Sequence, residues 1–157
     1  MDYYDFWKRA TKDIETIYTS VISTDGVLTL PKECLSGRCV EDDGYPVVLT
    51  NSLAEGILCL YSNTAFEGVQ ENLNRLNHLD SNVRYLVRRI IGEAIETLID
   101  KSGNIKIEAE LLSRLGFDTD QIPNDDQTVF PVTLLVYPHK IEIVSSTLYE
   151  KIKAELE

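Results

Sequence analysis

Hydrophobic and polar residues alternate in several short stretches of the chain. Apolar side chains occupy every second position in Leu28-Thr29-Leu30 and again in Ile105-Lys106-Ile107. A period of two is typical of a half-buried β-strand. Runs rich in β-branched and aromatic residues predict two further pairs of strands, at 47–50 with 57–61 and at 132–137 with 140–144. Because short turns join the members of each pair, at 51–56 and 138–139, each pair is expected to form a hairpin.

Other stretches have apolar residues at helical spacing. Residues 1–17 predict an amphipathic helical extension, packed on the body or on a neighbouring subunit, with apolar positions Tyr3, Phe6, Trp7, Ala10, Ile14 and Ile17. A helix that binds a different partner is the alternative. The stretch from Tyr18 to Ile22 then predicts a strand. Residues 81–96 predict a second helix, capped by Asp80 or Ser81, with the stripe Val83, Leu86, Val87, Ile90, Ile91 and Ala94.

Both hairpins are followed by similar sequences, 62–67 and 145–150. The patterns Thr64-x-x-Glu67 and Thr147-x-x-Glu150 match the capping box that opens many helices. A helix is therefore expected after each hairpin. The first should pack through Phe66, Val69, Leu73 and Leu76, and the second should run to the carboxyl end.

The most informative feature is an internal repeat, because residues 23–35 return 77 positions later as residues 100–112. Each copy predicts a turn around one glycine (Gly26 or Gly103), a short strand and a short helix. Pro31 suits the first turn of a helix, and Gly37 and Gly116 are expected to end the two helices. Two copies are too few for a solenoid, so we expect pseudo-symmetric halves with a shared core.

The repeat divides the chain into parts of one domain, residues 1–157. Residues 1–17 are the helical extension, 18–73 the first repeat, 74–96 the linking helix and 97–157 the second repeat. At 43% hydrophobic and 26% charged, a chain of 157 residues can bury one sizeable core. No apolar run approaches the roughly 20 residues that span a bilayer, and the first residues lack a secretion-signal pattern. These observations predict a cytoplasmic protein without membrane partners.

Charge counts against an anionic partner. The formal net charge of −11 repels nucleic acid at long range. One region differs, because Arg75, Arg84, Arg88 and Arg89 against Asp80 and Glu93 give residues 75–93 a net charge of +2. This region is expected to be a solvated or interfacial salt-bridge face, with Arg89 and Glu93 at a pairing distance of four positions. A patch that contacts phosphate is the alternative.

No metal or cofactor site is expected from the remaining polar residues. Cys34, Cys39 and Cys59 lack the spacing of zinc ligands and are expected to be reduced thiols, while His78 and His139 stand alone. The acidic stretches 41–44 and 118–127 are expected to be solvated loops, because their carboxylates lack the spacing of a calcium loop. No catalytic triad, paired carboxylate motif or phosphate loop occurs, so neither an enzyme nor a small-molecule substrate is expected.

This order of elements resembles the MraZ family, transcriptional regulators of bacterial division and cell-wall genes within the AbrB-like, swapped-hairpin group. The resemblance spans about Tyr18 to Leu156. It implies an α+β fold in which a duplicated β-α-β-β-α unit forms a pseudo-two-fold swapped-hairpin barrel with flanking helices. It also implies homo-oligomeric rings that present the glycine turns to DNA at the nucleoid.

The family hallmark is Asp-x-x-x-Arg in each half, and this chain departs from it twice. The second copy keeps Asp100 and Gly103 but has Asn104 at the arginine position. The first keeps Gly26, but Ser23 replaces the aspartate and Val27 the arginine. Neither Val nor Asn supplies the fork of charged donors with which arginine binds phosphate or guanine.

Polar residues around the turns are the remaining candidates for DNA contact. They are Thr24, Lys32, Lys101, Ser102, Asn104 and Lys106. Hydroxyl, amide and ammonium groups all bind phosphate oxygens. For Lys106 an outward-facing strand residue is the favoured interpretation over DNA contact, and Asp100 is expected to order its own turn.

Two functions are therefore compared. The first is a ring-forming DNA-binding regulator, favoured by the resemblance. The second is an oligomeric interaction or scaffold protein of the same fold that has lost DNA binding, favoured by the missing arginines and the negative charge.

Overall fold

The computed structural model describes residues 13–35, 44–117 and 129–156. The first repeat contains β1 (Thr16–Ile22), β2 (Val27–Thr29), the 3₁₀-helix η2 (Lys32–Leu35), β3 (Tyr45–Asn51), β4 (Ile57–Ser62) and α2 (Asn63–Asn74). α3 (Ser81–Val87) and the π-helix η3 (Arg88–Gly92) follow. The second repeat contains β5 (Ile95–Ile99), β6 (Asn104–Lys106), α4 (Ala109–Arg114), β7 (Phe130–Val136), β8 (Ile141–Ser145) and α5 (Ser146–Leu156). The same order of elements thus occurs twice.

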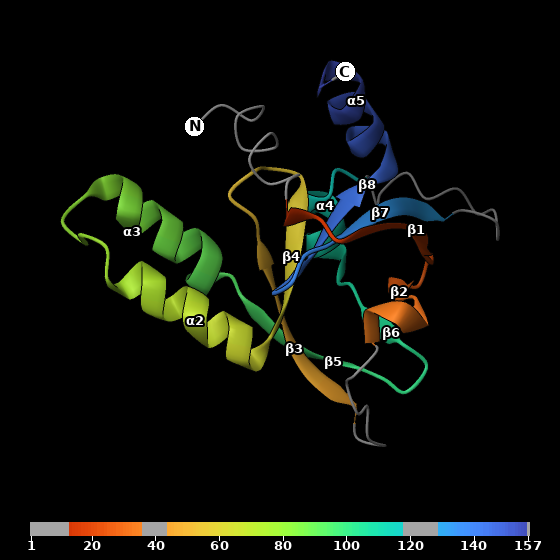
Figure 1. The fold of residues 1–157 in the computed structure, drawn as a ribbon, viewed down its shortest axis with the longest axis horizontal. Coiled ribbons are helices and arrows are strands. Elements are labelled where there is room, and N and C mark those ends of the chain that lie inside the picture. The colour runs from red at the N-terminus through yellow and green to blue at the C-terminus, as the bar shows by residue number, and fades with distance from the viewer. Residues whose placement is uncertain (1–12, 36–43, 118–128, 157) are drawn as a thin grey trace.

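The strands form one eight-stranded sheet in the order β5-β3-β4-β8-β7-β1-β2-β6. β1 of the first repeat pairs with β7 of the second, and β5 of the second pairs with β3 of the first. The repeats thus exchange their first strands. A tight turn joins β5 to β6, so the two ends of the sheet meet in a nearly closed barrel (Figure 1). The predicted α+β swapped-hairpin barrel is confirmed.

Apolar residues of both repeats fill the barrel. Ile22, Leu28 and Leu49 of the first repeat share one buried cluster with Ile99, Ile105 and Leu134 of the second. Because every strand alternates its side chains between two faces, this inner set leaves a second set facing outward. The two repeats therefore share one core.

Helices cover parts of the outer face. α5 packs over β7 and β8 through Ile152. α2, α3 and η3, residues 63–92, form a helical arm that extends from one side of the barrel (Figure 1). At the base of this arm, Phe66, Leu73 and Ile90 pack on Val48 of β3.

The predicted hairpins are confirmed as β3–β4 and β7–β8, and the strand predicted at 18–22 is β1. The predicted helix over 1–17 is wrong at its end, because Thr16 and Ile17 begin β1, where they pair with Val136 and Leu135. Residues 1–12 lie outside the described part of the chain, as do Gly37, Cys39 and the acidic stretches 41–43 and 118–127. Gly116 follows α4 with φ +89°, as predicted.

The helix starts differ from the prediction by two positions. Ser62, not Thr64, caps α2, because its Oγ accepts a hydrogen bond from the Ala65 amide at 3.1 Å. Ser145 acts in the same way on the Leu148 amide at 3.2 Å. Each strand therefore runs directly into its helix through a capping serine.

The predicted helix over 81–96 is also shorter than expected. Asp80 caps it, but the helix widens to a π-helix at Arg88 and ends at Gly92. Ile95 and Glu96 belong to β5, which pairs with β3. The apolar positions of the helix continue at the same spacing into β5. The sequence pattern therefore does not show where the helix ends and the strand begins.

Candidate nucleic-acid interface

The two glycine turns have the same backbone geometry. Gly26 and Gly103 have φ of 80° and 85°, a region that favours glycine. The Gly26 amide donates to the Ser23 carbonyl at 2.8 Å, and the Gly103 amide donates to the Asp100 carbonyl at 3.0 Å. The resemblance between the two stretches of sequence is therefore a structural repeat.

The first side chain of each turn binds the same backbone position. Ser23 Oγ accepts from the Val27 amide at 3.1 Å, and Asp100 Oδ1 accepts from the Asn104 amide at 2.9 Å. Asp100 Oδ1 also accepts from the Ser102 amide at 2.9 Å. Asp100 thus orders its own turn, and serine performs the equivalent task in the first copy.

Each turn is bound to the other repeat. The Leu30 amide donates to the Gly103 carbonyl at 2.8 Å, and the Ile107 amide donates to the Gly26 carbonyl at 2.6 Å. These bonds are equivalent under the 77-position offset and hold the two turns side by side. A Cβ on Gly26 would lie 2.6 Å from the Ile107 carbonyl oxygen, so the close approach requires glycine.

β2 and β6 lie between the turns and contain both positions at which the family hallmark has arginine. Val27 pairs with Lys106, and Thr29 pairs with Asn104. Thr29 Oγ1 donates to Asn104 Oδ1 at 2.6 Å across this ladder. Val27 and Asn104 are both half-buried, so longer side chains at these positions have a path to solvent.

The other candidate residues surround these strands. Lys106 is exposed, and its Nζ donates to the Asp25 carbonyl in the first turn. Thr24 precedes that carbonyl, Lys101 and Ser102 lie in the second turn, and Lys32 begins η2, two residues after the bond from Leu30 to Gly103. The fold therefore gathers around the paired turns residues that are about 80 positions apart in sequence.

Lysines and acidic residues are mixed near the turns. Residues 23–32 and 100–107 contain three lysines and two aspartates, a formal charge of +1, but with Glu33, Glu108 and Glu110 the full repeat copies 23–35 and 100–112 have a formal charge of −2. A hollow of about 360 Å³ lies beside them, lined by Val27, Gly44, Leu98, Asp100, Asn104, Ile105 and Lys106. Amide, ammonium and carboxylate groups thus share one surface. The amide and ammonium groups can bind phosphate oxygens, whereas the carboxylate repels them.

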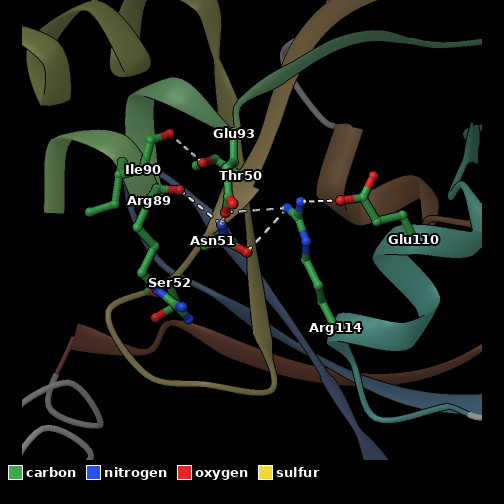
Figure 2. Close-up of polar contacts among 8 residues, drawn as sticks. All are labelled: Thr50, Asn51, Ser52, Arg89, Ile90, Glu93, Glu110 and Arg114. Atoms are coloured by element: carbon green, nitrogen blue, oxygen red, sulfur yellow. Dashed lines mark hydrogen bonds and ion pairs between the residues drawn. The ribbon is translucent and has the colours of Figure 1, made fainter. Parts of the chain in front are cut away.

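A second polar cluster fixes the arm to the barrel (Figure 2). Thr50 Oγ1 donates to the Ile90 carbonyl, and Asn51 Nδ2 donates to the Arg89 carbonyl at 2.8 Å and to Glu93. Arg89 Nε donates to the Ser52 carbonyl at 3.0 Å. Thr50 and Asn51 thus bind carbonyls of the π-helix, and Arg89 of that helix binds a carbonyl of the β3–β4 turn.

Arg114 extends this cluster to α4. Its guanidinium approaches Asn51 Oδ1 at 3.4 Å and Glu93 at 3.8 Å, and it binds Glu110 at 2.7 Å (Figure 2). Arg89 and Glu93 were predicted to pair with each other. In the structure Asn51 binds both of them, through the Arg89 carbonyl and the Glu93 carboxylate. Sequence reasoning missed Asn51 and Arg114, because they are 63 positions apart and belong to no recognisable motif.

A buried cluster on the outer face of the sheet is not suited to chemistry with a ligand. Cys59 of β4 lies opposite Glu142 of β8, and both are buried. Burial, with the Glu142 carboxyl nearby, raises the pKa of the Cys59 thiol to about 12. Burial likewise raises the pKa of Tyr61 and Tyr137. Within the described part of the chain, the Tyr137 hydroxyl and both Glu142 oxygens have no partner in hydrogen-bonding geometry.

Among the described residues, no group of three or more His, Cys, Asp or Glu side chains is arranged to hold a metal ion. None of the helices in the same residues has the length and apolar character needed to cross a membrane.

Comparison with known proteins supports the resemblance found in the sequence. No family model matches the chain. The transcriptional regulator MraZ of Nitrosococcus oceani is 28% identical over 141 residues, which cover 90% of this chain and 87% of that protein. The transcriptional regulator MraZ of Legionella pneumophila (strain Paris) is 25% identical over 129 residues, 82% of this chain and 77% of that protein. The barrel with its two exchanged strands agrees with these matches.

The matches, at 25–28% identity over most of the chain, support a divergent member of the MraZ family. Both relatives are named as transcriptional regulators, and the matches extend over both repeats rather than over one motif. The chain departs from the family hallmark at Val27 and Asn104, the two positions where the hallmark has arginine.

Proposed function

We propose that the protein is an MraZ-like transcriptional regulator that binds DNA through its two glycine turns as a ring of identical subunits. The observation that carries this proposal is the pair of turns joined by the bonds from Leu30 to Gly103 and from Ile107 to Gly26. These bonds place two equivalent turns side by side without help from a ligand. A preorganised pair of turns loses little conformational freedom when it meets a rigid duplex.

Lysine and neutral polar groups provide the contacts in this proposal. Lys101, Lys106 and Lys32 neutralise phosphates, while Thr24, Ser102 and Asn104 donate hydrogen bonds to phosphate or base-edge oxygens. Lys106 keeps two further donors when one binds the Asp25 carbonyl. Since lysine is a point charge without the arginine fork, each subunit binds weakly. Several subunits in one ring compensate through avidity on repeated DNA boxes.

The net negative charge of the chain repels DNA at long range. The affinity for DNA therefore has to come from the contacts made at the turns. Association with the nucleoid follows from the same contacts. The family resemblance supports a regulator rather than an enzyme.

The second function is a scaffold of the same fold that no longer binds DNA. It is favoured by Val27 and Asn104 at the arginine positions and by the net charge of −11. In that case the turns serve only to hold the repeats together, and the oligomer surface carries the function.

Salt-dependent binding to DNA separates the two functions. Fluorescence anisotropy with duplexes that carry repeated short boxes, including the DNA upstream of the protein's own gene, measures affinity at several salt concentrations. A regulator with three lysines at phosphates gives a log–log slope of about −3 for each bound subunit and prefers the repeated boxes to a shuffled duplex. Absence of binding to every duplex at low salt, with a discrete oligomer in light scattering, contradicts the regulator and supports the scaffold.

A further inference from the structure

Two pairs of side chains face outward from the ladder of β2 and β6, on the side away from the core. These pairs are Thr29 with Asn104 and Val27 with Lys106. The backbone bonds that join the two turns lie one position beyond each pair. Both are therefore non-hydrogen-bonded pairs of an antiparallel ladder, in which opposite side chains lie closest together.

The hydroxyl of Thr29 fixes the orientation of the Asn104 carboxamide. Thr29 Oγ1 donates to Asn104 Oδ1 at 2.6 Å. In a planar amide the oxygen and the nitrogen lie on opposite sides of the Cγ atom, so Nδ2 is directed away from Thr29. Asn104 lines the hollow beside the turns, and among the described residues its Nδ2 has no hydrogen-bond partner. Two N–H donors are therefore available to a partner.

Thr29 itself is held in place. Its carbonyl accepts from Ser20 Oγ at 2.9 Å, and its β-branched side chain has few rotamers. Its neighbours Leu28 and Leu30 are buried in the barrel. The amide of Asn104 is thus oriented before any partner arrives, which lowers the conformational entropy lost on binding.

This orientation decides what the amide can bind. An asparagine side chain that is free to rotate presents either its oxygen or its nitrogen. Phosphate oxygens and the oxygens of base edges are acceptors, so they repel an amide oxygen and bind an N–H group. Because the Thr29 hydroxyl occupies Oδ1, the donor side of Asn104 is the side that remains.

The pair of Val27 with Lys106 has different chemistry. Lys106 Nζ donates to the Asp25 carbonyl, and a Cβ on Gly26 would lie 3.0 Å from it. The lysine therefore lies over the first turn. Thr29 and Lys106 occupy the same position in the two repeats, as do Val27 and Asn104. One half of the surface thus offers a neutral amide, and the other half offers a cation.

We propose that Thr29 is a positioning residue: it holds the Asn104 carboxamide so that Nδ2 donates to an acceptor oxygen of DNA, in a phosphate or on a base edge. Lys106 supplies the charged contact of the other half. This inference deepens the proposed function and rests on it, because the paired turns must meet DNA. It makes the two halves unequal, with one contact that depends strongly on salt and one that does not.

A double-mutant cycle on DNA affinity tests the role of Thr29. Fluorescence anisotropy with the repeated-box duplex compares the wild-type chain with Asn104→Ala, Thr29→Val and the double variant. Each single change should weaken binding about threefold to tenfold, as the loss of one hydrogen bond does. The double variant should bind no more weakly than Asn104→Ala, because the hydroxyl acts only through the amide.

Two further variants serve as controls. Thr29→Ser keeps the hydroxyl and should bind like the wild-type chain. Thr19→Val makes the same change as Thr29→Val at an exposed threonine of β1 and should have no effect on affinity. Urea unfolding of each variant checks that the fold is kept.

The dependence on salt separates the amide contact from a general loss of binding. Lys106→Gln should lower the log–log slope by about one for each bound subunit. Asn104→Ala and Thr29→Val should leave the slope unchanged, because neither removes a charge. A shuffled duplex distinguishes the two acceptors. An equal loss on both duplexes assigns a phosphate oxygen, and a loss on the repeated boxes alone assigns a base edge.

Other results overturn the inference. Wild-type affinity in Thr29→Val, equal losses for Thr29→Ser and Thr29→Val, or losses that add in the double variant each show that the hydroxyl does not position the amide. If Lys106→Gln lowers the slope while Asn104→Ala binds like the wild-type chain, only this inference fails and the proposed function is kept. Absence of DNA binding by the wild-type chain overturns both.

Discussion

Leu28 of β2 lies directly opposite Ile105 of β6, and the two residues occupy the same position in the two repeats. The pseudo-two-fold axis therefore passes between them. Cys59 and Glu142 form the corresponding pair at the contact of β4 with β8. A duplicated unit that pairs with its own copy at both places closes the barrel and brings its two glycine turns together.

The approach of the two turns predicts a large cost for a methyl group at Gly26. Gly26→Ala places a Cβ 2.6 Å from the Ile107 carbonyl and requires φ near +80°. We expect a loss of about 2 kcal/mol or more in the free energy of unfolding, measured by urea denaturation. Gly68→Ala is the control, because no atom lies within 4 Å of the new Cβ in α2. It should stabilise by roughly 0.5–1 kcal/mol. Equal effects at both positions would contradict the interlocked turns.

The anchor of the arm predicts a loss of stability when one hydroxyl is removed. Thr50 is buried, and its Oγ1 satisfies the Ile90 carbonyl of the π-helix. Thr50→Val leaves this carbonyl unpaired and should cost about 1–3 kcal/mol in thermal or urea unfolding. Thr50→Ser, which keeps the hydroxyl, should cost clearly less. If serine and valine are equally destabilising, the hydrogen bond does not hold the arm.

Cys59 should be inert in the folded protein. Its pKa of about 12, against 9.0 for a free thiol, keeps it protonated at pH 8, and burial blocks access. Iodoacetamide labelling followed by mass spectrometry should modify Cys59 only after unfolding in urea. Because the pKa is raised in the folded state, the stability that depends on this thiol is complete below pH 9.0 and is lost as the pH rises toward 12. Rapid native labelling of Cys59 would contradict its burial.

Replacing the buried Glu142 by an apolar residue should raise the free energy of unfolding. Its side chain is fully buried beside the Tyr137 hydroxyl, and neither oxygen has a partner in good hydrogen-bonding geometry among the described residues. A buried carboxyl without a partner costs free energy, so Glu142→Met, of similar size, should stabilise by about 1–3 kcal/mol in urea unfolding. Glu150→Met, at an exposed position of α5, should change stability by less than about 0.5 kcal/mol. A loss of stability at position 142 would show that the carboxyl is compensated.

Local patterns were sufficient to predict most strands of the barrel. The alternation at 28–30 and 105–107, the two hairpins and the positive φ of the glycine turns all follow from periods and residue types that act over a few positions. β5 was missed because Ile95 continues the apolar stripe of the preceding helix. The two helix caps were misplaced because Ser62 and Ser145, two positions earlier, complete the same bond.

Long-range contacts could not be read from such patterns. The exchange of β1 and β5 was expected only from the family resemblance, since no local signal records which strand a segment will join. The bonds of Asn51 to Arg89 and of Lys106 to Asp25 join residues 38 and 81 positions apart. Polar side chains of this kind gain their partners only when the barrel closes.

Restoring arginine at both hallmark positions is the most direct test of the central claim that the two turns face DNA. Val27→Arg with Asn104→Arg adds two charges on the paired strands between the turns, and Thr64→Arg with Thr147→Arg adds the same charge at equivalent exposed helix starts. Titration of labelled duplex DNA at fixed moderate salt should show about tenfold or more tighter binding for the first pair than for the second. Equal affinity of the two double variants would contradict the claim.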